Sequence, residues 1–505
     1  MKTLFQLLDK LDIPYNKIAR TNELEISNIT LDSRNADCEK IFTAIKGFQT
    51  DGHNFIINAF NAGCRNFLVE DASKIPSEIC PESNIAQTQN IRRVFGMLAR
   101  SINDCPDESL KLFGITGTKG KTTVSTLLHH ILDYKQNTAI FTTVRFATPQ
   151  TNADSEKTTM EADKLQYYLQ QTKLGGWNQA VVEVSSHAVT LSRVENINWD
   201  CGIFTSFSRD HLDLYGTMEA YFQAKLDFFR ALNVSNKENK IAVINIDDEK
   251  GFDVCNVIDK NTVKLFTVSM KDKGADYFIA KSCYTASGTQ LTIIKNAKEE
   301  INLFIALKGE VNIINTGLAV CAAIEAGKMT KEEVIEAAKD FGGVPGRFEM
   351  VMTSPFCVMV DYAHTPQSIE KLLQEARKIS SGKIILVFGC TGDRDKEKRP
   401  IMGKIAAENA DYSILTNDDL YTENQEDIMK MLEAGFIEAG KHINENYEII
   451  YDRKTAIETA MKKAEPNDII LLAGMGHQKY QILNTGKVAY NDAQTVRELK
   501  KKFNY

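Results

Sequence analysis

The sequence predicts an α/β protein of three domains, with a P-loop-type, mostly parallel sheet in the central domain and a Rossmann-like C-terminal domain. The chain has 505 residues, and one domain usually takes about 100–200 of them. Short apolar runs alternate with helical patterns, which is typical of parallel sheets covered by helices. A glycine-rich turn, TGTKGKTT at 116–123, lies between an apolar run and a helical segment, the context that a phosphate-binding loop requires.

The N-terminal domain is predicted over residues 1–109. Apolar runs at 40–47 and 65–71 have the length of strands, and a helical pattern at 54–62 lies between them. Strands that alternate with helices in this way indicate a small α/β unit.

The central domain is predicted over residues 110–343. A strand at 110–116 precedes the glycine-rich turn, and a helix at 124–132 follows it. Further apolar runs predict strands at 180–184, 200–207, 241–246 and 263–269. The glycines and the proline of GGVPGRFE, at 342–349, interrupt the last helical pattern and mark the boundary.

The C-terminal domain is predicted over residues 344–505. Its apolar runs FCVMVDYA, KIILVFGC, DYSILTND and DIILLAGM are separated by helical segments. This order predicts a Rossmann-like sheet, whose ligands bind beyond the carboxyl ends of the strands.

Composition and charge exclude several classes of function. The net charge is −7, and no basic stripe suited to nucleic acid or polybasic run suited to an anionic membrane appears. No run of about 18 apolar residues predicts a membrane span. Asp9, Lys10 and Asp12 interrupt the apolar N-terminus, which argues against a signal peptide. Ten cysteines without a CxxC pair indicate reduced thiols in a cytoplasmic protein, and a monomer is the default expectation.

The glycine-rich turn is predicted to bind the phosphates of a nucleoside triphosphate. Its glycines allow backbone N–H groups to point at phosphate oxygens, next to the positive end of a helix dipole. Lys121 would reach the β- and γ-phosphates, and Thr122 would offer its hydroxyl to Mg²⁺. Ile115 occupies the first glycine position of the usual pattern, so a surface turn is the alternative. Alone, the turn indicates only an NTPase or a phosphoryl-transfer enzyme, and a kinase or motor ATPase would share it.

Further segments, taken in order, resemble the Mur ligases. They are EVSSH at 183–187 with Arg193, SRDHLD at 208–213, GRFE at 346–349 with DYAHTP at 361–366, and GDRDKEKRP at 392–400. LDSR at 31–34 and DGH at 51–53 resemble the uridine-nucleotide-binding domain of the MurE type. The resemblance covers nearly the whole chain.

The resemblance implies an ATP-dependent ligase of peptidoglycan precursor synthesis. ATP would phosphorylate the D-glutamate carboxylate of UDP-MurNAc-L-Ala-D-Glu, and the amine of an L-amino acid would attack the acyl phosphate. The implied catalytic residues are Lys121, Glu183, His211 and Lys225. The implied Mg²⁺ ligands are Thr122, Glu183, His211 and a carbamylated Lys225. Without the resemblance, a lysine on a helix is far more often solvated.

The resemblance also implies three groups of binding residues. For ATP they are Gly117, Thr118, Lys119, Gly120, Lys121, Thr122, Thr123, Asn312, Arg347 and Asp361. For the UDP-sugar they are, on the uridine side, Leu31, Ser33, Phe48, Gln49 and Thr50 and, on the muramoyl-dipeptide side, Thr158, Thr159, Ser185 and Arg193. For the amino acid they are Arg394, Asp418, Asp419, Tyr421, Gly474 and Gln478. His187 and His364 could each either contact a substrate or serve only as a structural hydrogen-bonding residue.

The sequence departs from the family where the amino acid is selected. MurE enzymes that use meso-diaminopimelate carry a DNPR segment, whose arginine pairs with the distal carboxylate, and here Tyr421 stands at that position. Gln478 replaces a glutamate, whereas Arg394 is retained for the α-carboxylate. We therefore expect lysine or ornithine, whose ammonium Asp418 or Asp419 would receive, rather than meso-diaminopimelate. A neutral amino acid is the alternative substrate that this pattern leaves open. Ser206, in place of an asparagine, is a further departure.

Two alternatives to this function stay open. A paralogue with the same chemistry would join an amino acid to a different acceptor in another pathway. A non-catalytic nucleotide-binding regulator would be marked by loss of Lys121, Glu183 or His211, and all of these are present.

Overall fold

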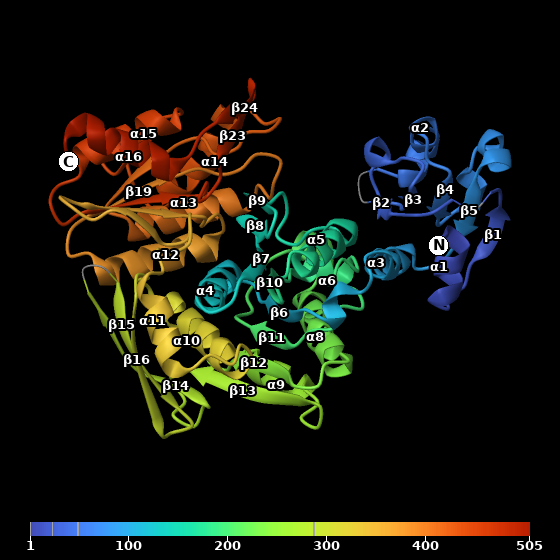
Figure 1. Cartoon of the computed structure of the whole chain (residues 1–505). Helices are drawn as coiled ribbons and strands as arrows, with labels where there is room; N and C mark the ends of the chain where they lie inside the picture. The colour runs from blue at the N-terminus through green and yellow to red at the C-terminus, as the bar shows by residue number, and fades with distance from the viewer. Residues whose placement is uncertain (1, 23, 48–49, 286–287) are drawn as a thin grey trace. The chain divides into compact units, whose positions relative to one another are not determined.

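The computed structural model describes residues 2–505 except 23, 48–49 and 286–287. Figure 1 traces the whole chain, which forms two compact units. The first comprises Met1–Ser282, Leu291–Phe304 and Ile314–Phe341, and the second comprises Cys283–Gln290, Ile305–Ile313 and Gly342–Tyr505. The predicted N-terminal domain and most of the predicted central domain lie in the first unit, whereas residues 283–290, 305–313 and 342–343 of the predicted central domain lie in the second.

A five-stranded sheet forms the N-terminal part of the first unit. Its order is β1-β5-β4-β3-β2, and only β1 runs antiparallel to its neighbour. The strands are β1 (Asn16–Ala19), β2 (Asn28–Thr30), β3 (Lys40–Ala44), β4 (Asn66–Val69) and β5 (Asn84–Gln87), and the helices are α1 (Leu4–Lys10), α2 (Ile56–Asn61) and α3 (Ile91–Ile102). Ile41 and Phe42 point to opposite faces of β3 and enter separate hydrophobic clusters, so apolar side chains cover both faces. The predicted strands 40–47 and 65–71 appear as β3 and β4.

An eleven-stranded sheet forms the centre of the first unit, in the order β16-β15-β14-β13-β12-β11-β6-β10-β7-β8-β9. The strands from β14 to β7 in this order run parallel, and β8 and β9 add an antiparallel edge. The parallel core consists of β6 (Lys111–Thr116), β7 (Thr138–Phe141), β10 (Gln179–Glu183), β11 (Cys201–Phe204), β12 (Lys240–Asn245) and β13 (Val263–Ser269). The edges are β8 (Arg145–Thr148), β9 (Thr151–Asp154), β14 (Tyr277–Tyr284), β15 (Thr289–Lys295) and β16 (Glu299–Ile305). Each predicted central strand appears here.

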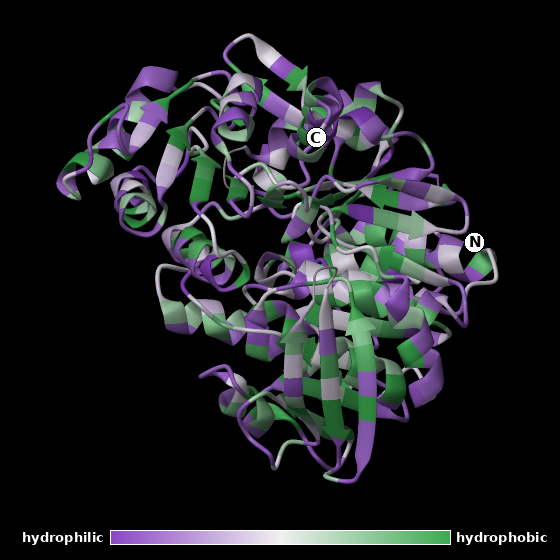
Figure 2. Ribbon diagram, turned by 90° about the vertical axis from the view of Figure 1, so that its left-hand side faces the viewer, coloured by the Kyte–Doolittle hydropathy of each residue, from purple (hydrophilic) through white to green (hydrophobic). Residues whose placement is uncertain are grey.

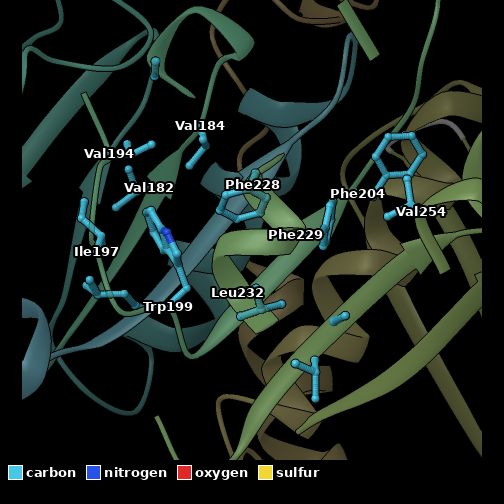
Figure 3. Close-up of a cluster of buried hydrophobic side chains, with 14 of the residues drawn as sticks. Val182, Val184, Val194, Ile197, Trp199, Phe204, Phe228, Phe229, Leu232 and Val254 are labelled. Atoms are coloured by element: carbon cyan, nitrogen blue, oxygen red, sulfur yellow. The ribbon is translucent and has the colours of Figure 1, made fainter. Parts of the chain in front are cut away.

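Helices cover this sheet, and α8 packs against it at two glycines. A Cβ atom built on Gly114 of β6 would lie 2.6 Å from Phe228 Cζ, and one on Gly202 of β11 would lie 3.0 Å from Leu232 Cδ2. These glycines let the apolar face of α8 pack on the strands, beside Trp199 (Figure 3). The helices are α4 (Lys121–Asp133), α5 (Ala162–Leu174), α6 (Ser186–Thr190), α7 (Leu212–Tyr215), α8 (Met218–Val234), α9 (Gly251–Val257), α10 (Glu310–Glu325) and α11 (Lys331–Lys339).

A six-stranded sheet, in the order β17-β18-β22-β19-β20-β21, forms the second unit. It is parallel except for β17. The strands are β17 (Glu349–Met352), β18 (Cys357–Asp361), β19 (Ile384–Phe388), β20 (Tyr412–Leu415), β21 (Tyr447–Ile449) and β22 (Ile469–Ala473), and a hairpin follows as β23 (Tyr480–Leu483) and β24 (Gly486–Ala489). The predicted runs appear as β18, β19, β20 and β22. Because these are parallel neighbours, their carboxyl ends meet at one edge, where a Rossmann-like sheet binds ligands.

Two helical layers enclose the sheet of the second unit. The helices α12 (Pro366–Ile379), α13 (Lys398–Asn409) and α14 (Gln425–Glu438) share one hydrophobic cluster. The helices α15 (Arg453–Lys463) and α16 (Asp492–Phe503) share another. Figure 2 shows that hydrophobic residues concentrate along the strands, and hydrophilic ones along loops and outer helix faces. Among the described residues, no helix is long and apolar enough to cross a membrane. All ten cysteines are free, as predicted.

Candidate active site

The phosphate loop follows β6 and ends where α4 begins at Lys121. Gly117 and Gly120 adopt φ angles of 148° and 86°, which side chains other than hydrogen rarely allow. A Cβ on Gly117 would lie 2.0 Å from Thr205 Oγ1, and one on Gly120 would lie 2.5 Å from Asn315 Oδ1. The loop therefore needs both glycines for its turn and for its close neighbours.

Lys121 curls over the loop that precedes it. Its Nζ donates to the carbonyl oxygens of Gly117, at 3.0 Å, and Thr118, at 3.1 Å. The ammonium is thereby held above the backbone at the N-terminus of α4, where both the helix dipole and its own charge favour an anion.

The segment after β11 braces the loop from the other side. Thr205 Oγ1 donates to the carbonyl oxygen of Lys119 at 2.6 Å, and the backbone N–H of Lys119 donates to Ser206 Oγ at 3.0 Å. Ser206 Oγ also donates to the Lys119 carbonyl at 3.1 Å. The serine that departs from the family pattern thus supports the conformation of the phosphate loop.

Glu183 ends β10, the strand next to β6, and is 1 % exposed. Its carboxylate accepts hydrogen bonds from Thr122 Oγ1, at 3.0 and 3.2 Å, and from the backbone N–H and Oγ1 of Thr143, at 2.9 and 3.0 Å. These donors compensate for burial of a charge. The Glu183 and Thr122 oxygens lie together and are the hard ligands that Mg²⁺ prefers, so this pair fits the ion.

The predicted muramoyl-dipeptide residues surround the same strand end. Thr143 Oγ1 donates to Thr158 Oγ1 at 3.1 Å, and Thr159 Oγ1 donates to the Glu183 carbonyl at 2.7 Å. The backbone N–H of Ser185 donates to Thr159 Oγ1 at 3.1 Å. One chain of hydrogen bonds therefore joins these hydroxyl groups to Glu183.

Arg193 reaches this chain from the turn after α6. Its Nη1 donates to the Thr159 carbonyl at 3.2 Å, and its Nη2 pairs with Glu161 Oε1 at 2.9 Å. Glu161, which lies just before α5, therefore already neutralises part of its charge.

Lys225 is fully buried on α8. It is in helical phase with Phe228, Phe229 and Leu232, so the face that packs on the sheet carries it inside. Its Nζ donates to Ser186 Oγ at 2.9 Å and lies 4.5 Å from the centre of the Tyr221 ring. Burial, and secondarily the charge of Lys121, hold the pKa of Lys225 well below its usual value. A neutral amine is therefore accessible at this position.

His211 lies immediately before α7, with a φ of 53°. Its ring centre is 4.7 Å from that of His187 and 5.7 Å from that of Tyr221. The Tyr221 hydroxyl and Thr118 Oγ1 share a hydrogen bond of 3.1 Å, which links this aromatic group to the phosphate loop. The described part of the chain holds no cluster of three or more His, Cys, Asp or Glu side chains suited to a metal. The four-member ligand set stays a prediction.

The predicted uridine-side residues lie in the N-terminal part. Ser33 begins a short 3-10 turn capped by Asp32, whose Oδ1 accepts from the Arg34 N–H at 3.0 Å, and Leu31 packs beside a hydrophobic cluster. The Thr50 carbonyl accepts from the Gly47 N–H at 2.9 Å. Phe48 and Gln49 lie outside the described residues. The DGH segment is a turn in which Asp51 accepts from the backbone N–H of His53 at 3.0 Å.

Asn312, Arg347 and Asp361, also predicted for ATP, belong to the second unit. Asp361 ends β18, and its Oδ2 accepts from the Phe348 N–H at 2.9 Å. The Arg347 guanidinium lies 4.6 Å above the Tyr362 ring, and Asn312 Nδ2 donates to the Lys308 carbonyl at 2.8 Å.

The predicted amino-acid residues follow three neighbouring strands of the second unit. Arg394 follows β19, Asp418, Asp419 and Tyr421 follow β20, and Gly474 and Gln478 follow β22. Asp418 is 2 % exposed, and burial raises its pKa to about 6 against the opposing charge of Arg453. Asp419 accepts from Gln478 Nε2 at 3.1 Å and from the Ile482 N–H at 2.7 Å. A Cβ on Gly474 would lie 2.7 Å from Asp418 Oδ2.

Sequence reasoning missed four residues that shape these sites. Asn315 and Tyr221 each lie about one helical turn from a predicted residue, Asn312 and Lys225, and that spacing was a usable signal. Thr143 and Arg453 carry no such signal. Arg453 forms a completely buried ion pair with Asp492 at 2.8 Å and donates to the Ala473 carbonyl at 2.9 Å.

Comparison with known proteins identifies the family. Three models match: the Mur ligase family catalytic domain at 25–102, the Mur ligase middle domain at 115–323 and the Mur ligase glutamate ligase domain at 346–476. The chain is 34 % identical over 493 residues to UDP-N-acetylmuramoyl-L-alanyl-D-glutamate–2,6-diaminopimelate ligase 1 of Clostridium acetobutylicum, covering 96 % of this chain and 97 % of the relative. It is 36 % identical over 480 residues to the corresponding ligase of Synechococcus elongatus, covering 94 % of each.

A solved structure agrees with this relationship. The structure of a UDP-N-acetylmuramoyl-L-alanyl-D-glutamate–2,6-diaminopimelate ligase matches with a TM-score of 0.65 at 28 % identity, covering 95 % of this chain and 96 % of that one. The predicted three-domain α/β fold class is confirmed. The chain belongs to the Mur ligase family of ATP-dependent, amide-forming ligases, and within it to the MurE type.

Proposed function

We propose that this ligase adds lysine or ornithine, rather than meso-diaminopimelate, to the D-glutamate of UDP-MurNAc-L-Ala-D-Glu. The observation that carries the proposal is the side-chain set after β20: two carboxylates, Asp418 and Asp419, with Tyr421 where an arginine would pair with a distal carboxylate. The relatives above are named for 2,6-diaminopimelate. The proposal keeps their acceptor and changes the amino acid. Since Mur ligases are cytoplasmic enzymes, we place the reaction in the cytoplasm.

Asp418 is better suited than Asp419 to receive a side-chain ammonium. Both oxygens of Asp419 are engaged, one by Gln478 and one by the Ile482 N–H. Asp418 accepts from the Asp419 N–H through Oδ1, at 2.8 Å. Its pKa of about 6 leaves it ionised at neutral pH. A distal carboxylate brought next to it would be repelled and unpaired, at a cost of about 2–5 kcal/mol.

The residues around the phosphate loop support phosphorylation of the acceptor carboxylate. Lys121 and the N-terminus of α4 would hold the β- and γ-phosphates of ATP. Thr122 and Glu183 would hold Mg²⁺, which neutralises phosphate charge when bound. Thr158, Thr159, Ser185 and Arg193 would orient the dipeptide so that its carboxylate faces the γ-phosphate. The amine of the amino acid then attacks the acyl phosphate, and phosphate leaves.

Lys225 fits a carbamate. Burial holds the pKa of its amine well below the usual value, and this favours the neutral form, which attacks CO₂, forms an N–C bond and releases one proton. The product is an anion beside Ser186 that the charge of Lys121 would attract. Incubation with ¹³C-bicarbonate should give a carbamate carbon signal that Lys225→Arg lacks. Equal spectra of the two proteins would contradict the carbamate.

Phosphate release tests the amino acid and the acceptor together. We expect release only when UDP-MurNAc-L-Ala-D-Glu and an amino acid are both present, with kcat/KM for lysine or ornithine at least ~30-fold above that for meso-diaminopimelate. Norleucine, which lacks only the lysine ammonium, is the matched control and should react poorly. Equal turnover with meso-diaminopimelate and lysine would overturn the choice of amino acid. Silence with this acceptor would favour a paralogue with another acceptor.

A further inference from the structure

Two loops at the carboxyl edge of the second unit's sheet are fastened to each other. We call residues 392–394, after β19, and 419–423, after β20, the paired loops. The Asp393 N–H donates to Glu423 Oε1 at 2.7 Å, and Thr422 Oγ1 donates to Asp393 Oδ1 at 2.8 Å. The Gly392 N–H donates to the Asp419 carbonyl at 2.7 Å. Each loop therefore supplies both donors and acceptors to the other.

Arg399 secures this arrangement from beneath. It lies in the first turn of α13 and is fully buried. Its Nη1 and Nη2 donate to the two carboxylate oxygens of Glu423 at 2.9 and 3.0 Å, and Nη2 also reaches the Thr391 carbonyl at 3.4 Å. The hydrogen bonds from Arg399 hold the pKa of Glu423 at about 2, so the pair stays charged. A lysine lacks the planar fork that makes both contacts.

The paired loops have little freedom to rearrange. A Cβ on Gly392 would lie 2.0 Å from the Leu420 carbonyl oxygen. Tyr421 adopts a φ of 50°, a left-handed conformation that a bulky residue keeps only when its surroundings impose it. Its ring centre lies 5.6 Å from the Arg394 guanidinium carbon. Arg394 thus lies beside a ring that the paired loops hold in place, and its Nη1 donates to the carbonyl oxygen of Asp393 at 3.3 Å.

We infer that Arg399 is a positioning residue, which acts through Glu423 to hold Arg394, beside the ring of Tyr421, for the α-carboxylate of the incoming amino acid. The inference rests on the proposed function, because that function gives Arg394 its ligand. Every L-amino acid carries the same α-carboxylate. Loosening the paired loops should therefore weaken the binding of every amino acid by one common factor. Changing a residue that contacts the amino-acid side chain would instead change the ratio of their affinities.

The test compares Arg399→Lys and Thr422→Val with wild type. For Arg399→Lys we expect KM for lysine and for ornithine to rise about tenfold and by the same factor. KM for the UDP-sugar dipeptide should stay within twofold. Thr422→Val removes only the hydroxyl contact with Asp393, so a rise of about threefold is expected. Arg100→Lys is the matched control, because Arg100 makes a similar two-pronged contact with buried Asp107 in the first unit, at 2.8 and 3.0 Å.

Several outcomes decide the inference. An unchanged amino-acid KM in folded Arg399→Lys would overturn it, as would an equal rise in Arg100→Lys or unequal factors for lysine and ornithine. If Arg399→Lys does not fold, Thr422→Val decides, with its melting temperature as the check on folding. Turnover of the wild-type enzyme with the amino acids tests the proposed function separately. If the wild-type enzyme is active and Arg399→Lys leaves the amino-acid KM unchanged, only the inference is refuted.

Discussion

The phosphate loop takes its groups from eight consecutive residues, 116–123, whereas the predicted amino-acid residues come from loops after three different strands. In the first unit, Gly117 and Gly120 shape the phosphate loop, and Lys121 folds back on it. In the second unit, the pair of Arg399 with Glu423 holds the loops after β19 and β20, and the buried pair of Arg453 with Asp492 joins α15 to α16. Phosphate chemistry is therefore encoded locally, while amino-acid selection depends on distant supports.

Loss of Lys121 should have the largest effect. In Lys121→Met we expect kcat to fall by about 10³ or more, because the charge that meets developing negative charge on the phosphates is gone. Lys119→Met is the matched neighbour, since the loop contacts of Lys119 with Thr205 and Ser206 are made by its backbone. Its kcat should fall far less. Steady-state phosphate release measures both, and equal losses would break the assignment of Lys121.

Breaking the buried pair Arg453–Asp492 should cost about 3–5 kcal/mol of unfolding free energy, because Asp492 would be left as an unpaired buried charge. Arg453→Met is the variant, and denaturant unfolding of the full chain is the measurement. Arg377→Met is the control, because the Arg377–Asp411 pair is exposed on the same unit. A similar loss in both variants would show that burial of the pair is not what matters.

Acidification should weaken lysine binding through Asp418. Burial raises its pKa to about 6, so below that pH it loses the charge that attracts the ammonium. KM for lysine should rise up to about tenfold per pH unit below pH 6. Asp418→Asn should give a high KM that no longer changes with pH, and a flat wild-type profile from pH 5 to 7 would contradict the role. The folded state also binds this proton more tightly than the unfolded one, so this group lowers stability as pH rises from about 4 to 6.

Ser206 should give the smallest effect. Ser206→Ala removes two hydrogen bonds from Lys119, and each is worth about 0.5–1.5 kcal/mol. We expect KM for ATP to rise a few-fold with little change in KM for the amino acid. Ser206→Asn, which restores the family's residue, should stay near wild type. A change confined to the amino acid would contradict the bracing role.

The sequence anticipated the fold well where apolar runs are long and bounded by turns. All the strands predicted in the centre of the first unit and in the second unit appear. It did not anticipate β14–β16 or the hairpin β23–β24, because β14, exposed at residues 281–283, and β24, exposed throughout, carry a weak apolar signal. The burial of Lys225 was predictable only from its phase with Phe228 and Leu232, since a lysine on a helix is usually solvated.

The sequence by itself determined the phosphate loop, the parallel sheets and the family. Each depends on the spacing of neighbouring residues, which local backbone geometry converts directly into structure. Only the tertiary structure decided that Glu183 lies against Thr122 and Thr143, that Asp419 is engaged by Gln478, and that Arg399 supports the paired loops. These contacts join residues that are distant in the chain. No local pattern encodes them, because burial and charge pairing are settled only when the strands and helices pack.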